Sequence, residues 1–315
     1  MRACLECLPC LARNAIDLAR KSAQGDAALE ARIAAEGMRI LGRAAEGGYA
    51  LPPPCYARQL IDAALAMCEG RVPDPWSEEK KASTELALKL LEALSHKGAL
   101  GGSQFTATDT DAMNCVPPGM SDFEKRLRLS VAGNILDFSV YADLDIAAAM
   151  ETMKESFTKP VDAASVAELK RRMDAAKSIL WIFDNCGEAV FDRLLMEPYR
   201  DKITLAVRGK PAFNDVTRAD LEPSGLLPPD FAKCGGRIVS NDDGVPGVVD
   251  ATCGDQFRAA FAAADLIVAK GQANFETMSE RTDKSIAFLF LAKCPVVCRS
   301  VGAEPKTIQV LLRNF

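Results

Sequence analysis

Apolar residues in the first half of the chain recur every three or four positions, which is the spacing of one face of an α-helix. The segment that starts at Ser77 shows this most clearly, because Glu78 and Glu79 follow a good N-cap residue and leucines then recur along one side. Glycines from Gly98 onward end this helix. The same spacing predicts a long connection over residues 100–118 and further helices over residues 8–22, 26–45, 55–69, 122–139 and 143–156.

The pattern changes after about residue 160, where short, continuously apolar runs alternate with segments of helical length. Asp162 is placed to cap the first of these helices, and the run that follows has the length and composition of a strand buried on both faces. This alternation predicts an α/β fold with a doubly wound, mostly parallel sheet. We therefore expect an all-helical domain over residues 1–160 and a sheet domain over residues 161–315. The predicted strands are residues 178–183, 203–207, 237–239, 266–269, 287–291 and 296–298.

The composition is that of a globular protein, with 49% hydrophobic and 26% charged residues, so disorder and fibrous structure are excluded. Its 38 Lys and Arg against 43 Asp and Glu give a formal net charge of −5, which argues against nucleic acid as a partner. No apolar run is long enough to span a membrane, and charged residues interrupt the stretch where a signal peptide would be apolar. We expect a cytoplasmic protein that acts on a small molecule.

The chain has a single histidine, His96, near a predicted helix end. Catalytic triads and metal sites that need several imidazoles are therefore excluded. If a metal ion takes part, its ligands are expected to be oxygen atoms, which favours Mg²⁺ or Mn²⁺.

Eleven cysteines in a chain without an export signal argue against a disulfide framework. Cys4, Cys7 and Cys10 have the spacing that opens a ferredoxin-type run, but the fourth cysteine of such a run is missing, so an iron–sulfur cluster is not expected. We interpret these three as buried thiols near a helix start. A zinc site completed by Cys294 and Cys298, or a redox-sensitive pair, are the alternatives.

Polar residues follow the first two predicted strands of the sheet domain. Asp184 and Asn185 come directly after the first strand, with Glu188 one turn into the next helix, and Asp215 lies beyond the second strand. Ligands of open α/β sheets bind beyond the carboxyl ends of the strands. Carboxylate and amide oxygens gathered there are suited to a hard divalent cation.

The strand over residues 266–269 is followed by Lys270, Gly271 and Asn274 at the start of another helix. Glycine lets the backbone approach a ligand closely, a helix N-terminus supplies N–H groups, and lysine supplies positive charge. This turn is therefore a candidate phosphate cradle. A single strand-end Asp is usually a helix cap and a single Lys-Gly usually a turn, but their agreement at one sheet edge favours a metal-assisted phosphate site.

The residues at this edge and their order resemble the damage-control phosphatases, which are also catalogued as domain-of-unknown-function group eighty-nine. The resemblance covers essentially the whole chain, and the N-terminal cysteines together with Pro73-Asp74-Pro75-Trp76 resemble the stand-alone microbial branch. The matching motifs are Asp184-Asn185-x-Gly187-Glu188-x3-Asp192, Asn214-Asp215-Val216-Thr217, Lys270-Gly271-Gln272-x-Asn274-x-Glu276, Lys293-Cys294 and Gly133-Asn134-x-x-Asp137. Cys186 departs from the small residue, often Ala, expected at its position.

The resemblance implies a helical N-terminal domain, a Rossmann-like α/β/α domain, and hydrolysis of phosphomonoesters with Mn²⁺, Mg²⁺, Co²⁺ or Ni²⁺. Sugar phosphates and phosphopantetheine-like compounds are the implied substrates. Carried over by residue, Asp184, Asn185 and Asp215 would hold the metal. Asn134 and Asp137 would line the substrate pocket from the helical domain, and Glu188 would also bind the substrate. The phosphate contacts would be Lys270, Gly271, Asn274 and Lys293.

Asp184 is the pivotal carboxylate in this hypothesis, as nucleophile towards phosphorus or as the group that orients an attacking water; the sequence leaves both roles open. A rival interpretation is an S-adenosylmethionine-dependent carboxyl methyltransferase, but the acidic turn after the first strand suits a cation better than a cofactor carboxylate. A third is a non-enzymatic regulator that binds a phosphometabolite or a metal.

Overall fold

The structure is a computed structural model that describes residues 1–315 apart from 97–116, 118, 137–145, 222–225 and 229. The predicted pocket residue Asp137 and nearly all of the predicted connection over residues 100–118 lie outside the described residues. In the described part of the chain, no helix is long and apolar enough to cross a membrane.

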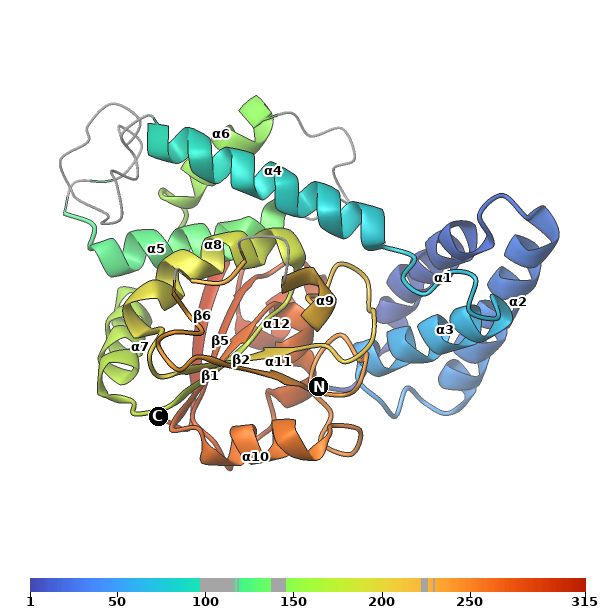
Figure 1. Cartoon of the computed structure of the whole chain (residues 1–315). Helices are drawn as coiled ribbons and strands as arrows, with labels where there is room; N and C mark the ends of the chain where they lie inside the picture. The colour runs from blue at the N-terminus through green and yellow to red at the C-terminus, as the bar shows by residue number, and fades with distance from the viewer. Residues whose placement is uncertain (97–116, 118, 137–145, 222–225, 229) are drawn as a thin grey trace.

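The first helices form a bundle that lies to one side of the sheet (Figure 1). Their apolar faces enclose a separate cluster that includes Leu18, Ile33 and Leu60. Asp26 caps the second helix by accepting a hydrogen bond from Leu29 N. The bundle consists of η1 (Leu5–Cys7), α1 (Leu8–Ala23), α2 (Ala27–Glu46) and α3 (Pro53–Met67).

The later helices of the first half pack on the sheet domain. Leu90 of α4 and Leu127 of α5 belong to the same buried cluster as Trp181 of the first strand. The predicted boundary at residue 160 stays a prediction, and this hydrophobic core runs across it. These elements are α4 (Ser77–His96), α5 (Asp122–Ala132), η2 (Gly133–Leu136) and α6 (Ile146–Ser156).

The sheet has the order β3-β2-β1-β4-β5-β6 and is parallel except for its last strand, which confirms the predicted α/β class with a mostly parallel sheet. The strand order reverses at β1, because β2 and β3 lie on one side of it whereas the next strand, β4, pairs on its other side. Ligand sites of open α/β sheets form where the order reverses in this way. The strands are β1 (Ile179–Ile182), β2 (Ile203–Val207), β3 (Arg237–Ser240), β4 (Leu266–Lys270), β5 (Ile286–Leu291) and β6 (Ile308–Arg313).

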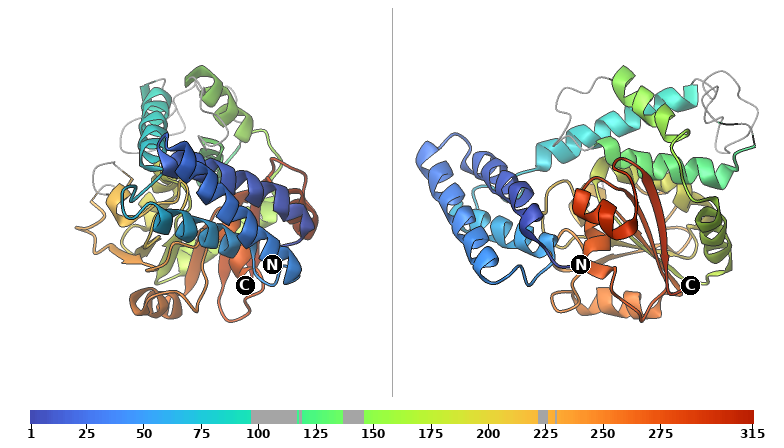
Figure 2. Two further views of the ribbon diagram at one scale, coloured as in Figure 1. Left: turned by 90° about the vertical axis from the view of Figure 1, so that its right-hand side faces the viewer. Right: turned by 180° about the vertical axis from the view of Figure 1, so that it is seen from behind.

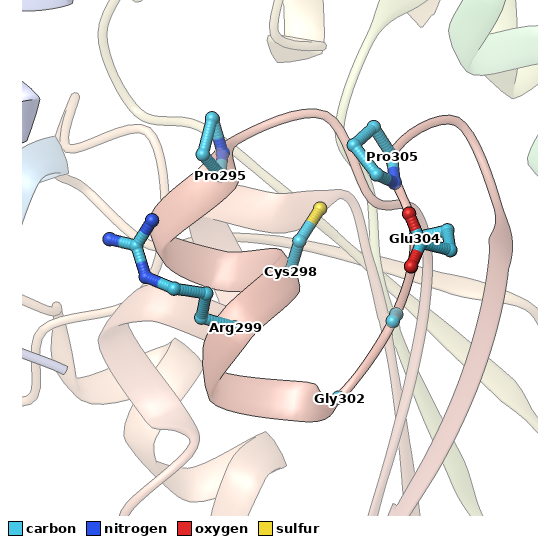
Figure 3. A pocket seen from close by; sticks show the side chains of 7 residues that line it. Pro295, Cys298, Arg299, Gly302, Glu304 and Pro305 are labelled. Carbon is cyan, nitrogen blue, oxygen red and sulfur yellow. The ribbon is translucent and has the colours of Figure 1, made fainter.

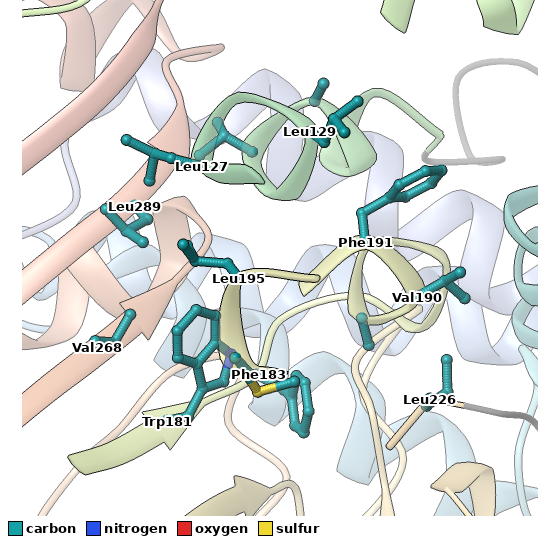
Figure 4. Packing of buried hydrophobic residues seen from close by; sticks show 14 of the residues in the cluster. Leu127, Leu129, Trp181, Phe183, Val190, Phe191, Leu195, Leu226, Val268 and Leu289 are labelled. Carbon is teal, nitrogen blue, oxygen red and sulfur yellow. The ribbon is translucent and has the colours of Figure 1, made fainter. Parts of the chain in front are cut away.

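Helices cover both faces of the sheet. Alternate strand residues point to opposite sides and therefore pack against different helices. Trp181 and Val268 face α8 and α5 (Figure 4), whereas Ile182 and Ile267 face Phe257 and its neighbours on the other side. The first face carries α7 (Ala163–Ala175) and α8 (Cys186–Met196), and the second carries α10 (Asp255–Ala263), α11 (Gln272–Met278) and α12 (Pro295–Val301). The remaining short helices are η3 (Glu197–Tyr199) and α9 (Arg218–Leu221).

The end of the chain differs from the prediction. Residues 296–298 form part of α12 instead of a strand, because Pro295 occupies the start of a helix and Gly302 ends it in the left-handed conformation. The final strand, β6, was not predicted. It is an edge strand that pairs antiparallel to β5, and its half-buried residues give it a weaker apolar signal than the central strands.

Candidate active site at the carboxyl ends of the strands

Asp184 lies at the junction of β1 and α8, where the chain leaves the sheet. The following residue, Asn185, is the N-cap of α8. The Asp184 carboxylate is 8% exposed, and its Oδ2 atom accepts hydrogen bonds from Nδ2 of Asn134 at 2.9 Å and from Nδ2 of Asn185 at 3.0 Å. A buried carboxylate is therefore held in place by amide groups from two parts of the chain.

The loop after β2 brings the second predicted carboxylate to the first. Asn185 and Asp215 form an isolated antiparallel bridge, in which Cys186 N donates to Asn214 O at 2.9 Å and Val216 N donates to Asp184 O at 2.9 Å. The structure thus places Asp184, Asn185 and Asp215 next to one another at this sheet edge.

Arg208 fixes Asp215 and is a site residue that sequence reasoning missed. Its Nε atom donates to Oδ2 of Asp215 at 2.6 Å, and its other nitrogens donate to Gly247 O at 2.7 Å and Asn274 Oδ1 at 3.3 Å. The side chain is 2% exposed. Its place directly after β2 was the available signal, but an arginine at a strand end is usually solvated, and only the fold shows that this one is buried.

Gly271 lies against the Asp184 carboxylate from the β4 side. Its φ of +78° is a conformation that favours glycine, and a Cβ atom built there would lie 2.0 Å from Asp184 Oδ2. Its N–H donates to Leu289 O at 3.0 Å. Gly271 therefore makes room for the carboxylate, while its amide is engaged in the sheet.

Lys270 does not occupy the position expected of a phosphate contact. Its side chain is fully buried, and Nζ donates to Glu188 Oε1 at 2.6 Å, to Asp192 Oδ1 at 2.7 Å and to Ser130 Oγ at 2.9 Å. An ammonium group has three donors, and this arrangement uses all of them. The structure makes Lys270 the internal counter-ion of two carboxylates on α8.

Asp192 and Ser130 were not predicted as site residues. Ser130 Oγ donates to Asp192 Oδ1 at 2.6 Å, and Trp181 Nε1 donates to Asp192 Oδ2 at 3.4 Å. Asp192 appeared in the sequence only as one position of a longer motif. Its spacing from Glu188 on one helix face was the signal that both could share one cation.

Asn274 also differs from its predicted role. It is fully buried, its Nδ2 atom donates to Lys270 O at 2.6 Å, and its Oδ1 atom accepts from Arg208. Both ends of the amide are thus engaged within the protein. Asn274 holds the end of β4 and the guanidinium of Arg208 in place.

Asn134 connects the helical half to the sheet edge. Its Nδ2 atom donates to Glu188 Oε2 at 2.8 Å as well as to Asp184, and its backbone oxygen accepts from Lys293 Nζ at 3.1 Å. Lys293 is exposed, unlike Lys270, and its charge acts on Asp184. Lys293 is therefore the predicted phosphate contact whose position at the surface fits that role.

The site concentrates negative charge in a buried place. Burial raises the pKa of Asp184 well above its ordinary value, and the neighbouring carboxylates of Asp215 and Glu188 raise it further, against the lowering effect of Arg208 and Lys293. Burial also raises the pKa of Asp192 to about 6 despite the charge of Lys270. An added cation between Asp184 and Asp215 would relieve this repulsion.

Comparison with known proteins identifies the family. The sequence model of the damage-control phosphatase ARMT1-like domain matches residues 3–308, which is nearly the whole chain. The chain belongs to this family.

Two relatives of this protein are named damage-control phosphatases. The one from Pyrococcus horikoshii is 31% identical over 319 residues, covering 100% of this chain and 99% of the relative. The one from Archaeoglobus fulgidus is 27% identical over 287 residues, covering 87% and 91%. The crystal structure of a DUF89 family protein from Pyrococcus horikoshii superposes with a TM-score of 0.79 at 27% identity over 100% of both chains. These comparisons confirm the resemblance to the damage-control phosphatases and the predicted fold class, and the family they identify is one of phosphatases.

A shallow pocket lies elsewhere in this family member, beside α12 (Figure 3). None of the residues that line it belongs to the predicted metal and phosphate site. They are Pro295, Cys298, Arg299, Gly302, Ala303, Glu304 and Pro305.

Few carboxylates at the sheet edge are available as metal ligands. Within the described residues, no three His, Cys, Asp or Glu side chains are grouped in a way that could hold a metal ion. A cation beside Asp184 would therefore depend on two carboxylates together with the amide oxygen of Asn185. Such a mixed oxygen set is usual for Mg²⁺, which keeps several waters.

Proposed function

We propose that this protein is a divalent-metal-dependent phosphatase that hydrolyses small phosphomonoesters. The observation that carries the proposal is the meeting of Asp184, Asn185 and Asp215 at the carboxyl ends of β1 and β2. Family membership supports phosphatase activity, and the metal and the substrate are our inferences from the site.

The residues at the site fit a hard divalent cation. Asp184, Asn185 and Asp215 offer only oxygen donors to a metal. Burial first, and then the charges of Asp215 and Glu188, raise the pKa of Asp184, and a bound cation would offset the repulsion among these carboxylates. When bound, Mg²⁺ or Mn²⁺, with Co²⁺ or Ni²⁺ as substitutes, would neutralise phosphoryl oxygens. The contribution of the protein is to hold these three metal ligands in fixed positions.

The surrounding residues keep these ligands in place. The amide of Asn134 holds Oδ2 of Asp184, and the guanidinium of Arg208 holds Oδ2 of Asp215. The exposed ammonium of Lys293 is placed to attract the phosphate dianion towards Asp184. Lys270 acts behind them, because its buried ammonium is the counter-ion of Glu188 and Asp192.

Two roles for Asp184 are separated by one experiment. If this group attacks phosphorus, the ester bond breaks and an acyl phosphate forms on Asp184, which water then hydrolyses by attack at phosphorus. Hydroxylamine added during turnover would convert that acyl phosphate into a hydroxamate with release of phosphate, and no hydroxamate would form if Asp184 only orients the attacking water. Mass spectrometry of the peptide that contains Asp184 reads the difference.

The substrate class is tested by phosphate release from a panel of sugar phosphates and phosphopantetheine-like compounds. We expect turnover that a chelator abolishes and that Mn²⁺ or Mg²⁺ restores. Asp184→Asn and Asp215→Asn should lose at least about 10²-fold in kcat while remaining folded. Asp201→Asn, a change at an exposed position away from the site, is the matched control. Undiminished turnover in the chelated protein, or in Asp184→Asn, would overturn the proposal.

A further inference from the structure

The N-terminal cysteines lie at two helix starts that follow one another. Cys4 is the N-cap of η1 and Cys7 is the N-cap of α1, and their Sγ atoms are 3.8 Å apart. Cys7 is buried, at 6% exposure, whereas Cys4 is half-buried. A reachable thiol therefore lies beside a protected one at the start of a helix, the arrangement in which a Cys-x-x-Cys pair exchanges with disulfides.

A third thiol approaches from the other end of the chain. Cys294 is the N-cap of α12, and its half-buried thiol acts electrostatically on both Cys7 and Cys10. Burial, with a smaller contribution from the thiols of Cys4 and Cys294, raises the pKa of Cys7 to about 11. The fold thus gathers thiols from residues 4–10 and from residue 294 in one place.

We propose that Cys4 and Cys7 form a redox-active dithiol that is oxidised by small disulfides. The Cys4 thiolate attacks one sulfur of the small disulfide, forms a mixed disulfide and releases one thiol. Cys7 then loses its proton and attacks Sγ of Cys4, which releases the second small thiol and closes a Cys4–Cys7 disulfide. Two protein thiols are oxidised and one small disulfide is reduced to two thiols.

The geometry favours this pair over a metal site. Closing the bond requires the two sulfur atoms to move from 3.8 Å to about 2 Å, at a helix start that carries no side-chain cap to be lost. No metal-binding group of three or more His, Cys, Asp or Glu is present among the described residues, which include Cys4, Cys7, Cys10 and Cys294.

Closure of the disulfide would act on α12. Glu6 lies between the two cysteines, and its Oε1 atom accepts a hydrogen bond from Arg299 of α12 at 2.6 Å. Figures 1 and 2 show the first residues of the chain running from the bundle to the side of the sheet domain that carries α12. At the start of the same helix, Lys293 N and Cys294 N both donate to Gln272 Oε1 at 3.2 Å. A change at residues 4–7 therefore reaches α12 through a direct ion pair.

The test uses the full chain, equilibrated with oxidised glutathione, alkylated and then cleaved after glutamate. Cleavage after Glu6 separates Cys4 from Cys7, so the two peptides remain joined only if a disulfide links them. We expect loss of two alkylatable thiols, a mass decrease of about 2 Da and a joined pair that persists in Cys10→Ser. The rate of hydrogen exchange should change on closure at the start of α1, which Cys7 caps, and in α12, which Glu6 contacts through Arg299.

Variants separate the steps. Cys7→Ser should stop the reaction at a glutathione adduct on Cys4, and Cys4→Ser should leave Cys7 alkylatable. Cys55→Ser, which removes a half-buried thiol of α3, should oxidise like the wild type. A link between Cys10 and Cys294, oxidation of Cys4 and Cys7 no greater than that of Cys55, or bound zinc that prevents oxidation would each overturn the proposal. None of these readouts depends on phosphatase activity.

Discussion

Gly271 and Asp184 are so close that a methyl group on Gly271 would lie 2.0 Å from Oδ2 of the carboxylate. The pair joins the carboxyl ends of β4 and β1, the neighbours at which the strand order reverses. The backbone of one strand end therefore defines the space that the pivotal carboxylate of the other can occupy.

Gly271→Ala should abolish most of the activity. The new methyl group would displace the Asp184 carboxylate, and a displacement of about 1 Å costs about 10²-fold in rate. Gly70→Ala is the matched control, because Gly70 has a φ of +77° and no atom within 4 Å of the added Cβ. Both variants should lose stability from backbone strain, Gly271→Ala by about 1–3 kcal/mol because its φ of +78° and ψ of 158° suit only glycine, and only Gly271→Ala should lose kcat. Equal kcat values for the two variants would contradict the close approach.

Lys270→Met should destabilise the fold. Removal of the ammonium leaves Glu188 and Asp192 buried without their counter-ion, which costs about 3–5 kcal/mol in the free energy of unfolding measured with urea. Adding Glu188→Gln and Asp192→Asn should recover part of the loss, because the unpaired charges are its cause. The control is Lys233→Met, which breaks an exposed pair with Asp230 and should leave the free energy of unfolding nearly unchanged. Similar losses in the two single variants would argue against a charge effect.

Arg208→Lys should reduce kcat by about 10- to 100-fold with a smaller change in KM. A single ammonium nitrogen cannot contact Asp215, Gly247 O and Asn274 together, so Asp215 becomes less well positioned. Steady-state phosphate release measures both constants. Arg281→Lys, which alters a pair of ion contacts on the other side of the sheet, should leave both constants unchanged. An unchanged kcat in Arg208→Lys would remove Arg208 from the site.

Glu276 should make stability fall with rising pH. Burial raises its pKa from 4.5 to about 7, so between these values the folded chain binds more protons than the unfolded one. The free energy of unfolding therefore decreases as pH rises through this window, by roughly 3 kcal/mol at most. Glu276→Gln should make this decrease smaller, because Asp184 and Asp192, whose pKa values are also raised, remain, and it should be more stable than the wild type at pH 8.

Urea unfolding between pH 5 and 8 checks the Glu276 prediction. Glu280→Gln, at a side chain that is 81% exposed, should keep the wild-type slope. A Glu276→Gln variant with the wild-type slope would show that another group is responsible.

The pattern of apolar residues predicted most of the elements and the order in which they occur. Central strands such as β1 and β4 are apolar at every position because helices cover both their faces, and that signal is strong in one sequence. The edge strand β6 was not predicted, and part of the helix α12 was wrongly predicted as a strand. An edge strand is half-exposed, so its apolar pattern is weak. Residues 296–298 are apolar because they pack against the rest of the protein, and a buried strand would be apolar for the same reason.

The sequence by itself determined the chemistry available at the sheet edge, because strand-end residues converge wherever strands are parallel. It therefore placed Asp184, Asn185 and Asp215 in one group. Only the tertiary structure decided which charged groups face that group and which are used within the protein. Lys270 and Lys293 are the same residue type at two strand ends, yet one is buried between carboxylates and the other is exposed. The physical reason is that burial and pairing depend on helices α5 and α8, which are distant in sequence from both lysines.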